Sequence, residues 1–376
     1  MDNKSPLIRE FERVASLEYK DIGSHLPEDR ISIGFFCPYV PEEMLHAARA
    51  FPLRLMGPPI KMSRAQAHLP PNCCHLAKSS LESLLQGELD FLKGIIFSHT
   101  CDVMQGLSDI FAFQKRIPLL FNLMMPTNLN SERSIPYLKE EIGRFKDFLQ
   151  KNVGEVSRQS LASSIQLFNQ VRGKVQRLYQ LRQKGPGLIS GSDFAHIIRA
   201  GYQMDRNQYL ALLNGLLSEL PQGDKETNAL VPVYLIGNMI HSPSYFTMIE
   251  EAGASVVYDN LCSGARFLRL MTREDIDPID ALAERYLSSY WCPTKHGGAM
   301  GHLETLIQEV EGTGAKGVIF LFYKYCELHY FDYPDLKRAF EAKSIPSLLL
   351  EVDDPATSQG QLKIRIQAFV EMLNQI

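Results

Sequence analysis

The chain reads Gly94-Ile-Ile-Phe97 in its first half and Gly317-Val-Ile-Phe320 in its second. Each of these apolar runs leads to a cysteine, Cys101 or Cys326, and then to a further run that begins with an Ile-Pro pair. Short, nearly continuous apolar runs separated by helical stretches are typical of the buried strands of a parallel sheet. The repetition therefore predicts two copies of one α/β unit.

Each half contains four such runs. They cover 31–36, 53–56, 94–98 and 117–122 in the first half, and 231–236, 254–258, 317–322 and 345–350 in the second. Because helical stretches separate the runs, we expect an α/β fold with two doubly wound domains. Their four-stranded parallel sheets would face each other.

The middle of the chain contains no convincing strand. Apolar residues recur there at three- and four-residue steps from Leu161 to Leu181, which predicts one long amphipathic helix. Gly185 and Pro186 would end this helix, and Ser190 would cap the next. A polar segment at 221–228 is the best linker. The predicted organisation is a helical lead-in with a first α/β domain at 1–134, a helical region at 135–225 and a second α/β domain at 226–376.

Composition limits the function classes. The 376 residues carry 39 basic and 43 acidic side chains, a net charge of −4, which argues against a nucleic-acid-binding surface. No apolar run has the roughly 18 residues of a membrane span, and the charged N-terminus lacks the apolar core of a signal peptide. We therefore expect a cytoplasmic protein with no membrane partner, in which cysteines stay reduced.

Six of the seven cysteines are predicted at strand ends or in loops, three from each half. They are Cys37, Cys74, Cys101, Cys262, Cys292 and Cys326. In an open parallel sheet the functional crevice lies outside the carboxyl ends of the strands, so we expect all six to face one cleft between the domains. Thiolates gathered in this way are what an iron–sulfur cluster requires.

Other interpretations of these cysteines remain open. A single buried cysteine is most often a small apolar residue, and thiolates also suit zinc. However, the chain has no Cys-x-x-Cys pair, and six dispersed ligands exceed the needs of one tetrahedral ion. Only Cys73 and Cys74 are adjacent enough for a redox dithiol, and neighbouring cysteines pair poorly. Iron–sulfur ligation is the interpretation that uses all six.

Three further motifs bear on chemistry. His99 precedes Cys101 by two residues, where it could donate a hydrogen bond to sulfur or a proton to a substrate. Glu42 and Glu43 stand at a predicted helix start, where carboxylates also favour the helix dipole. The Gly-x-Gly-x-x-Gly match that begins at Gly312 precedes a strand, so it predicts a helix end and turn and not a nucleotide site. With no Walker motif in the chain, any use of ATP would belong to a partner.

The cysteine contexts resemble the 2-hydroxyacyl-CoA dehydratase and benzoyl-CoA reductase family over most of the chain. The matching segments are Gly34-Phe-Phe-Cys37-Pro-Tyr-Val-Pro-Glu-Glu43, Cys74-His-Leu-Ala-Lys78-Ser79, His99-Thr-Cys101-Asp102, Asp259-Asn-Leu-Cys262-Ser-Gly264, Tyr325-Cys326, and Glu351 through Gly360-Gln361 to Arg365. The resemblance implies two α/β domains around an oxygen-sensitive cluster. It also implies a separate ATP-hydrolysing iron–sulfur activator that delivers electrons, and a second subunit, identical or related.

The resemblance assigns the cysteines to two sets. Cys74, Cys101 and Cys326 match the ligands of a single [4Fe-4S] cluster in acyl-CoA dehydratases. The other three, Cys37, Cys262 and Cys292, match additional positions of the branch with a double-cubane [8Fe-9S] cluster. The expected function is therefore low-potential reduction of a small molecule at such a cluster, or else a dehydratase, reductase or electron-transfer subunit acting with an acyl-CoA substrate. His99 and Glu43 are the predicted catalytic residues.

Overall fold

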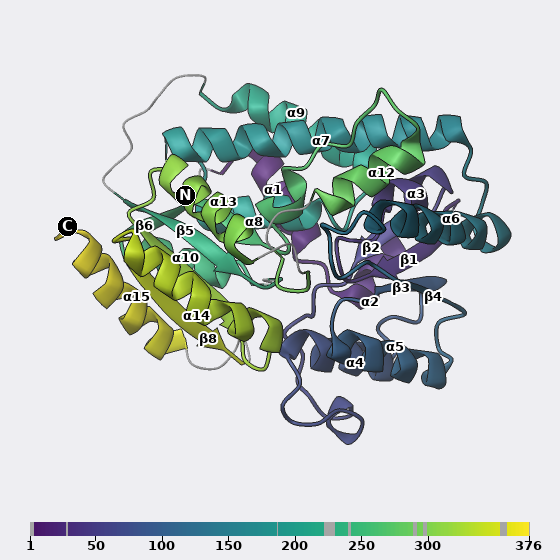
Figure 1. Ribbon diagram of the computed structural model, residues 1–376, viewed down its shortest axis with the longest axis horizontal. Coiled ribbons are helices and arrows are strands. Elements are labelled where there is room, and N and C mark those ends of the chain that lie inside the picture. Colours follow the sequence, from purple (N-terminus) through teal and green to yellow (C-terminus); the bar gives the residue numbers. More distant parts are fainter. Residues whose placement is uncertain are drawn as a thin grey trace.

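Two parallel sheets lie side by side in the computed structural model, and one long helix runs past both (Figure 1). The structure describes residues 4–27, 29–185, 187–221, 230–239, 242–288, 292–295, 299–353 and 359–375. Most of the predicted linker at 221–228 therefore lies outside the described residues, and the predicted domain limits stay predictions.

The first sheet contains β1 (Ser32–Phe35), β2 (Phe51–Arg54), β3 (Gly94–Ser98) and β4 (Leu119–Leu123) in the order β2-β1-β3-β4. The second contains β5 (Val231–Gly237), β6 (Ala254–Leu261), β7 (Gly317–Tyr323) and β8 (Ser347–Val352) in the equivalent order β6-β5-β7-β8. All pairings are parallel. The predicted α/β class and the doubly wound duplication are confirmed.

The shared strand order creates two equivalent crevices. In each sheet the chain passes from the first strand to a neighbour on one side and then crosses to the other side. The loops that leave the carboxyl ends therefore diverge between β1 and β3, and again between β5 and β7. Ligands of open α/β sheets bind at such points.

Strand sequence explains why helices cover both faces of each sheet. Successive side chains of a strand point to opposite faces, and in β7 every residue is buried. Ile319 and Leu321 pack with α10 (Ser244–Glu251) and α15 (Gln359–Leu373), whereas Val318 and Phe320 pack with α13 (Ala299–Gly312) and α14 (Glu327–Ala342). In the first sheet the corresponding layers are α4 (His75–Gln86) with α5 (Asp102–Gln114), and α3 (Glu42–Ala47) with α6 (Ser134–Asn152).

The predicted long helix is α7 (Arg158–Lys184), and it contributes to two cores. Its first half buries Leu161 and Ile165 with the first sheet, and its second half buries Val175 and Leu178 with a helical cluster. The remaining helices of the described chain are α1 (Pro6–Ala15), α2 (Tyr19–Ile22), η1 (Gly23–His25), η2 (Ala65–Ala67), α8 (Gly191–Ala200), α9 (Arg206–Glu219), α11 (Ala265–Leu268) and α12 (Pro278–Leu287). In this way α7 joins the two halves.

Two local predictions are confirmed. Ser190 caps α8 by accepting a hydrogen bond from the backbone N–H of Asp193, and Gly185 follows the last residue of α7. The helix α13 ends at Gly312, and Gly314 has a left-handed φ of 70°, so the glycine motif forms a turn before β7. Across the described segments, none of the helices has the length and apolar character to cross a membrane.

Candidate functional site

Three of the predicted cysteines share one local geometry. Cys74, Cys101 and Cys326, here called the N-cap cysteines, are the N-cap residues of α4, α5 and α14. Burial raises the pKa of each thiol, to about 12 for Cys101, while backbone N–H groups of the first helical turn oppose that rise. Backbone N–H groups at a helix start can help to hold a negatively charged sulfur.

The N-cap cysteines are neighbours in space although α14 belongs to the other half of the chain. A negative charge on Cys74 raises the pKa of both Cys101 and Cys326, and Cys101 also raises that of Cys326. The start of α4 meets the carboxyl ends of β7 and β8 there: the ring of His75 lies 5.5 Å from that of Tyr323, and Lys78 Nζ lies 3.8 Å from Asp353. The three sulfur atoms therefore face each other across the two sheets.

The other three, Cys37, Cys262 and Cys292, here called the loop cysteines, form a second group. Cys37 follows β1, and Cys262 follows β6 directly, because this strand continues three residues beyond its predicted end. Burial and, to a smaller extent, the charges of Cys292 and Cys262 together raise the pKa of Cys37 to about 12. The structure thus brings together residues from the first sheet, the second sheet and the segment 292–295.

A buried carboxylate shapes the turn that carries Cys262. Asp259 Oδ1 accepts hydrogen bonds from the backbone N–H groups of Leu261 at 3.1 Å and Ala265 at 3.0 Å, and Oδ2 accepts one from the Tyr179 hydroxyl at 2.6 Å. A Cβ on Gly264 would lie 2.0 Å from Asp259 Oδ1. The motif from Asp259 to Gly264 therefore needs its aspartate as a turn acceptor and its glycine for close approach.

Arg54, which sequence analysis missed, joins the two halves beside the loop cysteines. Its side chain is fully buried at the end of β2, and its Nε and Nη2 donate to the carbonyl oxygens of Phe36 at 3.1 Å and Cys262 at 2.8 Å. Its guanidinium covers the ring of Tyr202 at 4.6 Å. Within the described part of the chain, Nη1 has no hydrogen-bond partner and no carboxylate pairs with Arg54. A buried cation of this kind needs a nearby negative charge.

Arg266 is a second buried cation in direct contact with a loop cysteine. Its Nη1 donates to Cys262 Sγ at 2.8 Å, and its Nη2 donates to the carbonyl oxygens of Gly237 at 2.9 Å and Asn260 at 2.7 Å. Lys295 is a third: burial lowers its pKa, whereas the charges of Cys292 and Cys37 raise it. Positive charge therefore surrounds the loop cysteines.

Asn238, just beyond β5, contacts one cysteine of each group. Its Oδ1 accepts a hydrogen bond from the backbone N–H of Tyr323 at 2.8 Å. This bond turns the amide so that Nδ2 lies 3.1 Å from His329 Nδ1. His329 Nδ1 also lies 3.2 Å from Cys326 Sγ. The backbone carbonyl of Asn238 accepts a hydrogen bond from the backbone N–H of Cys262 at 3.3 Å. The two groups of cysteines therefore meet at the carboxyl end of β5.

The donor set fits an iron–sulfur group better than a single ion. Among the described residues, no three cysteine sulfurs lie within 4.8 Å of one another, the proximity expected of ligands to one metal. A cluster instead distributes its thiolates over several iron atoms. Burial raises the pKa of Cys37, Cys74, Cys101, Cys262 and Cys326, and a bound metal would remove the protons of its thiol ligands. The buried Nη1 of Arg54 and the helix N-termini then offer partners for the resulting negative charge.

The predicted catalytic residues occupy different surroundings. His99 is half-buried at the end of β3, and its backbone N–H donates to the carbonyl of Leu123 at 3.0 Å. Glu43 is fully buried at the start of α3, where Arg172 bonds it and Arg285 lies 3.8 Å away. Burial would raise the pKa of Glu43, but the two guanidiniums hold it at about 2.

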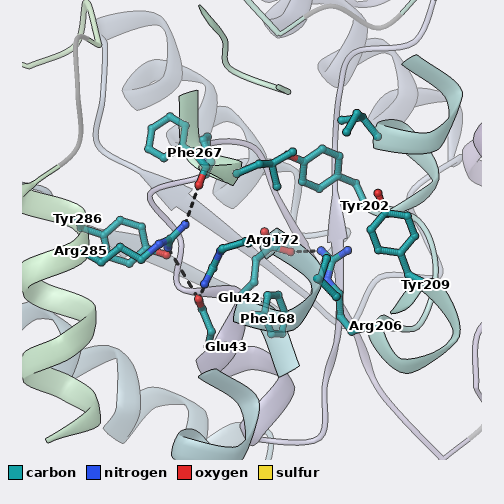
Figure 2. A pocket seen from close by; sticks show the side chains of 15 residues that line it. Glu42, Glu43, Phe168, Arg172, Tyr202, Arg206, Tyr209, Phe267, Arg285 and Tyr286 are labelled. Atoms are coloured by element: carbon teal, nitrogen blue, oxygen red, sulfur yellow. Dashed lines mark hydrogen bonds and ion pairs between the residues drawn. The ribbon is translucent and has the colours of Figure 1, made fainter. Parts of the chain in front are cut away.

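Glu43 lines a pocket beside the cysteines. Figure 2 shows Arg172 and Arg285 pointing toward Glu43, while Arg206 reaches Glu42. The pocket holds about 30 Å³ of free space, room for only about one or two waters. Pro38, which follows Cys37, contributes to its wall, but none of the six cysteines does. These contacts favour a structural ion pair at Glu43.

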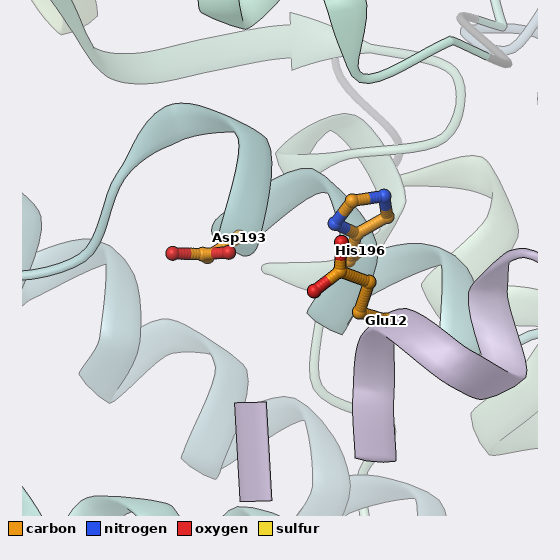
Figure 3. A group of neighbouring side chains, drawn as sticks. All are labelled: Glu12, Asp193 and His196. Carbon is orange, nitrogen blue, oxygen red and sulfur yellow. The ribbon is translucent and has the colours of Figure 1, made fainter. Parts of the chain in front are cut away.

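Glu12, Asp193 and His196 form the other group of potential ligands in the described chain (Figure 3). Their ligand atoms lie within 4.8 Å of one another. However, Lys4 Nζ already lies 2.9 Å from Asp193 and 3.3 Å from Glu12, so an ammonium group pairs with both carboxylates. We interpret this group as an ion-pair network that ties α1 to α8.

A signal for the missed residues does exist in the sequence. Arg54 stands inside the apolar run Leu53-Arg-Leu-Met56, and a charged residue in a buried strand requires a specific partner. Arg266 and Asn238 carry no comparable signal, because Asn238 lies in the loop after β5 and Arg266 lies in the short helix α11. Cys73 behaves as a small apolar residue: it is buried with the core of the first sheet.

Comparison with known proteins supports the resemblance seen in the cysteine contexts. Residues 37–373 match the family described as 2-hydroxyglutaryl-CoA dehydratase, D-component. The chain is 26% identical over 375 residues to the (R)-phenyllactyl-CoA dehydratase beta subunit of Clostridium sporogenes, covering 99% of this chain and 100% of that protein. It is 27% identical over 383 residues to the beta subunit of (R)-2-hydroxyglutaryl-CoA dehydratase from Acidaminococcus fermentans, covering 98% and 99%. A subunit of benzoyl-CoA reductase from Thauera aromatica is 25% identical over 344 residues, covering 89% and 88%.

Proposed function

Because this chain belongs to the family of the 2-hydroxyglutaryl-CoA dehydratase D-component and is an enzyme subunit, we propose that it performs low-potential reductive chemistry at an iron–sulfur cluster. The proposed ligands are the six cysteines of the two groups, and the proposed cofactor is a double-cubane [8Fe-9S] cluster. The proposed substrate is a small unsaturated molecule.

One observation carries this proposal: the cysteines form two groups of three that meet at the carboxyl ends of two equivalent sheets. A double cubane keeps three thiolates on each half, so its ligand requirement matches two groups of three. The link from Cys262 through Asn238 to His329 and Cys326 supports a single shared site for both groups. The N-cap cysteines and the loop cysteines are also the two sets of cysteines that the family resemblance separates.

The surrounding residues supply the setting for this chemistry. A cluster bound there would supply one-electron reduction and an iron able to bind a substrate atom. The helix N-termini would donate N–H groups to the N-cap cysteines, and Arg266 would donate to Cys262. Partial burial of the sulfurs would limit water access and protect the reduced state. We keep His99 as the proposed proton donor, whereas the contacts of Glu43 support a role in fixing α3, just after Cys37.

The proposed partners follow from the family and from the sequence. Relatives carry names such as beta subunit, which supports association with a second subunit, related or identical. We propose that a separate ATP-dependent iron–sulfur activator delivers the electrons, because the chain has no Walker motif. All seven cysteines are free thiols, as suits the proposed cytoplasmic location.

A second candidate is a subunit of an acyl-CoA dehydratase or benzoyl-CoA reductase with one [4Fe-4S] cluster. The names of the relatives favour it, and the N-cap cysteines alone would provide its three thiolates. In that case the loop cysteines would be ordinary buried thiols. An electron-transfer subunit would have the same ligands without a substrate.

Iron and acid-labile sulfide determination on the anaerobically purified chain separates the candidates. About eight iron atoms per chain are expected for the double cubane and about four for the single cluster. Cys262→Ser should lower the iron content of a double cubane but leave a single cluster intact, whereas Cys101→Ser should damage both. Acetylene reduction and acyl-CoA dehydration assays, each with ATP and an activator, then identify the reaction. Iron content near zero in the wild-type chain would refute both candidates.

A further inference from the structure

The two groups of cysteines differ in the charges around them. Three cations accompany the loop cysteines: Arg54, which is fully buried, Arg266, which is 1% exposed, and Lys295, whose pKa burial lowers. Arg266 contacts Cys262 Sγ directly, and the charge of Arg54 acts on both Cys37 and Cys262. Because the two arginine side chains are shielded from water, their fields are weakly screened.

The N-cap cysteines have a different electrostatic environment. Asp102 and Glu327 directly follow Cys101 and Cys326 as the first residues of α5 and α14, and each is exposed. Lys78 lies near Cys74, but Asp353 lies 3.8 Å from its ammonium group. The backbone N–H groups at these helix starts are dipoles without net charge, and their effect is confined to the first turn. Full positive charges therefore concentrate at the loop cysteines.

Adding an electron to a cluster adds negative charge, so nearby buried cations make reduction more favourable and nearby carboxylates make it less favourable. From this asymmetry we infer that the first electron enters the iron atoms held by the loop cysteines, and that Arg54 and Arg266 are the residues that direct it there. One external low-potential donor is oxidised by one electron, and iron at this end is reduced by one electron. The inference deepens the proposed function and rests on it.

A redox titration monitored by electron paramagnetic resonance tests this assignment on the full chain. The protein is purified anaerobically, its iron content is confirmed, and it is then titrated with titanium(III) citrate. Arg54→Met, Arg266→Met and Lys295→Met each remove one positive charge. For each variant we expect the equilibrium constant for the first reduction to fall at least about tenfold, a 59 mV decrease in potential. The matched variants Arg54→Lys and Arg266→Lys keep the charge and should retain most of the potential.

Variants of the carboxylates beside the N-cap cysteines test the opposite effect on the first reduction potential. Asp102→Asn and Glu327→Gln remove negative charge beside the N-cap cysteines, so they should raise the first potential by less than the Met variants lower it. If Asp102→Asn and Glu327→Gln change the first reduction potential more than the Met variants do, the electron enters at the N-cap cysteines and the inference is wrong. The ammonium group of Lys295 makes no hydrogen bond within the described chain. The Lys295→Met protein is therefore expected to fold even if the arginine variants do not assemble.

The outcomes also separate this inference from the proposed function. A wild-type chain without iron refutes both. A chain with about four iron atoms, all lost in Cys101→Ser and retained in Cys262→Ser, refutes the inference and leaves the single-cluster function. A chain with about eight iron atoms whose first potential is unchanged in Lys295→Met and in the arginine variants refutes the inference alone. Lowered potentials in the Met variants, recovered in the Lys variants, support it.

Discussion

Replacing Glu43 by Gln should destabilise the protein strongly even in the absence of any cluster. The side chain is fully buried, and its carboxylate bonds Arg172 with Arg285 at 3.8 Å. The variant would leave two buried guanidiniums without their shared anion. Removing one member of a buried ion pair costs about 3–5 kcal/mol, because the remaining charge stays desolvated and uncompensated.

The lowered pKa of Glu43 leads independently to a similar value for this loss of stability. A carboxyl whose pKa falls from its ordinary 4.5 to about 2 in the folded protein contributes about 3 kcal/mol to stability near neutral pH, since each pKa unit corresponds to about 1.4 kcal/mol. The folded-state pKa is the lower one, so this contribution is complete above pH 4.5. It declines as the pH falls from 4.5 toward 2, because the unfolded chain then binds the proton first.

Urea unfolding of the apo-protein measures both effects. At pH 7 the free energy of unfolding of Glu43→Gln should be about 3 kcal/mol below that of the wild type. Between pH 4.5 and pH 3 the wild type should lose stability and the gap to the variant should narrow. The control is Asp275→Asn, which breaks an exposed pair with Arg273 and should change the free energy of unfolding far less, because water screens this pair. If Glu43→Gln costs no more than Asp275→Asn, the structural role assigned to Glu43 is wrong.

Three further predictions concern the cluster site. Gly264→Ala places a Cβ 2.0 Å from Asp259 Oδ1, so the turn that carries Cys262 should open and the iron content should fall; unchanged iron would contradict this account of the turn. Cys73→Ser should keep the wild-type iron content while Cys74→Ser loses iron, because only Cys74 caps α4 toward the other N-cap cysteines. ATP should leave the melting temperature of the isolated chain unchanged, and a saturable rise would show that the chain binds nucleotide itself.

Much of the fold was predictable because the relevant signals are local. Apolar runs such as the one at Gly94 and its copy at Gly317 are buried on both faces, so their hydrophobicity alone marks them as strands of a parallel sheet. The helix α7 was predictable because its buried residues recur at helical spacing. Boundaries were less accurate: β6 extends to Leu261, since polar Asp259 and Asn260 remain in the strand and are satisfied there by tertiary hydrogen bonds.

The α/β duplication, the family and the six candidate cysteine ligands could all be inferred before folding was considered, because contiguous residues carry strand hydrophobicity and the short cysteine contexts. The charges that accompany these cysteines became visible in the folded chain alone. Arg54 reaches Cys262 across 208 positions of the chain, and Arg172 reaches Glu43 across 129. Burial and pairing of a charge depend on residues that folding brings together from distant segments, and no local pattern encodes that proximity.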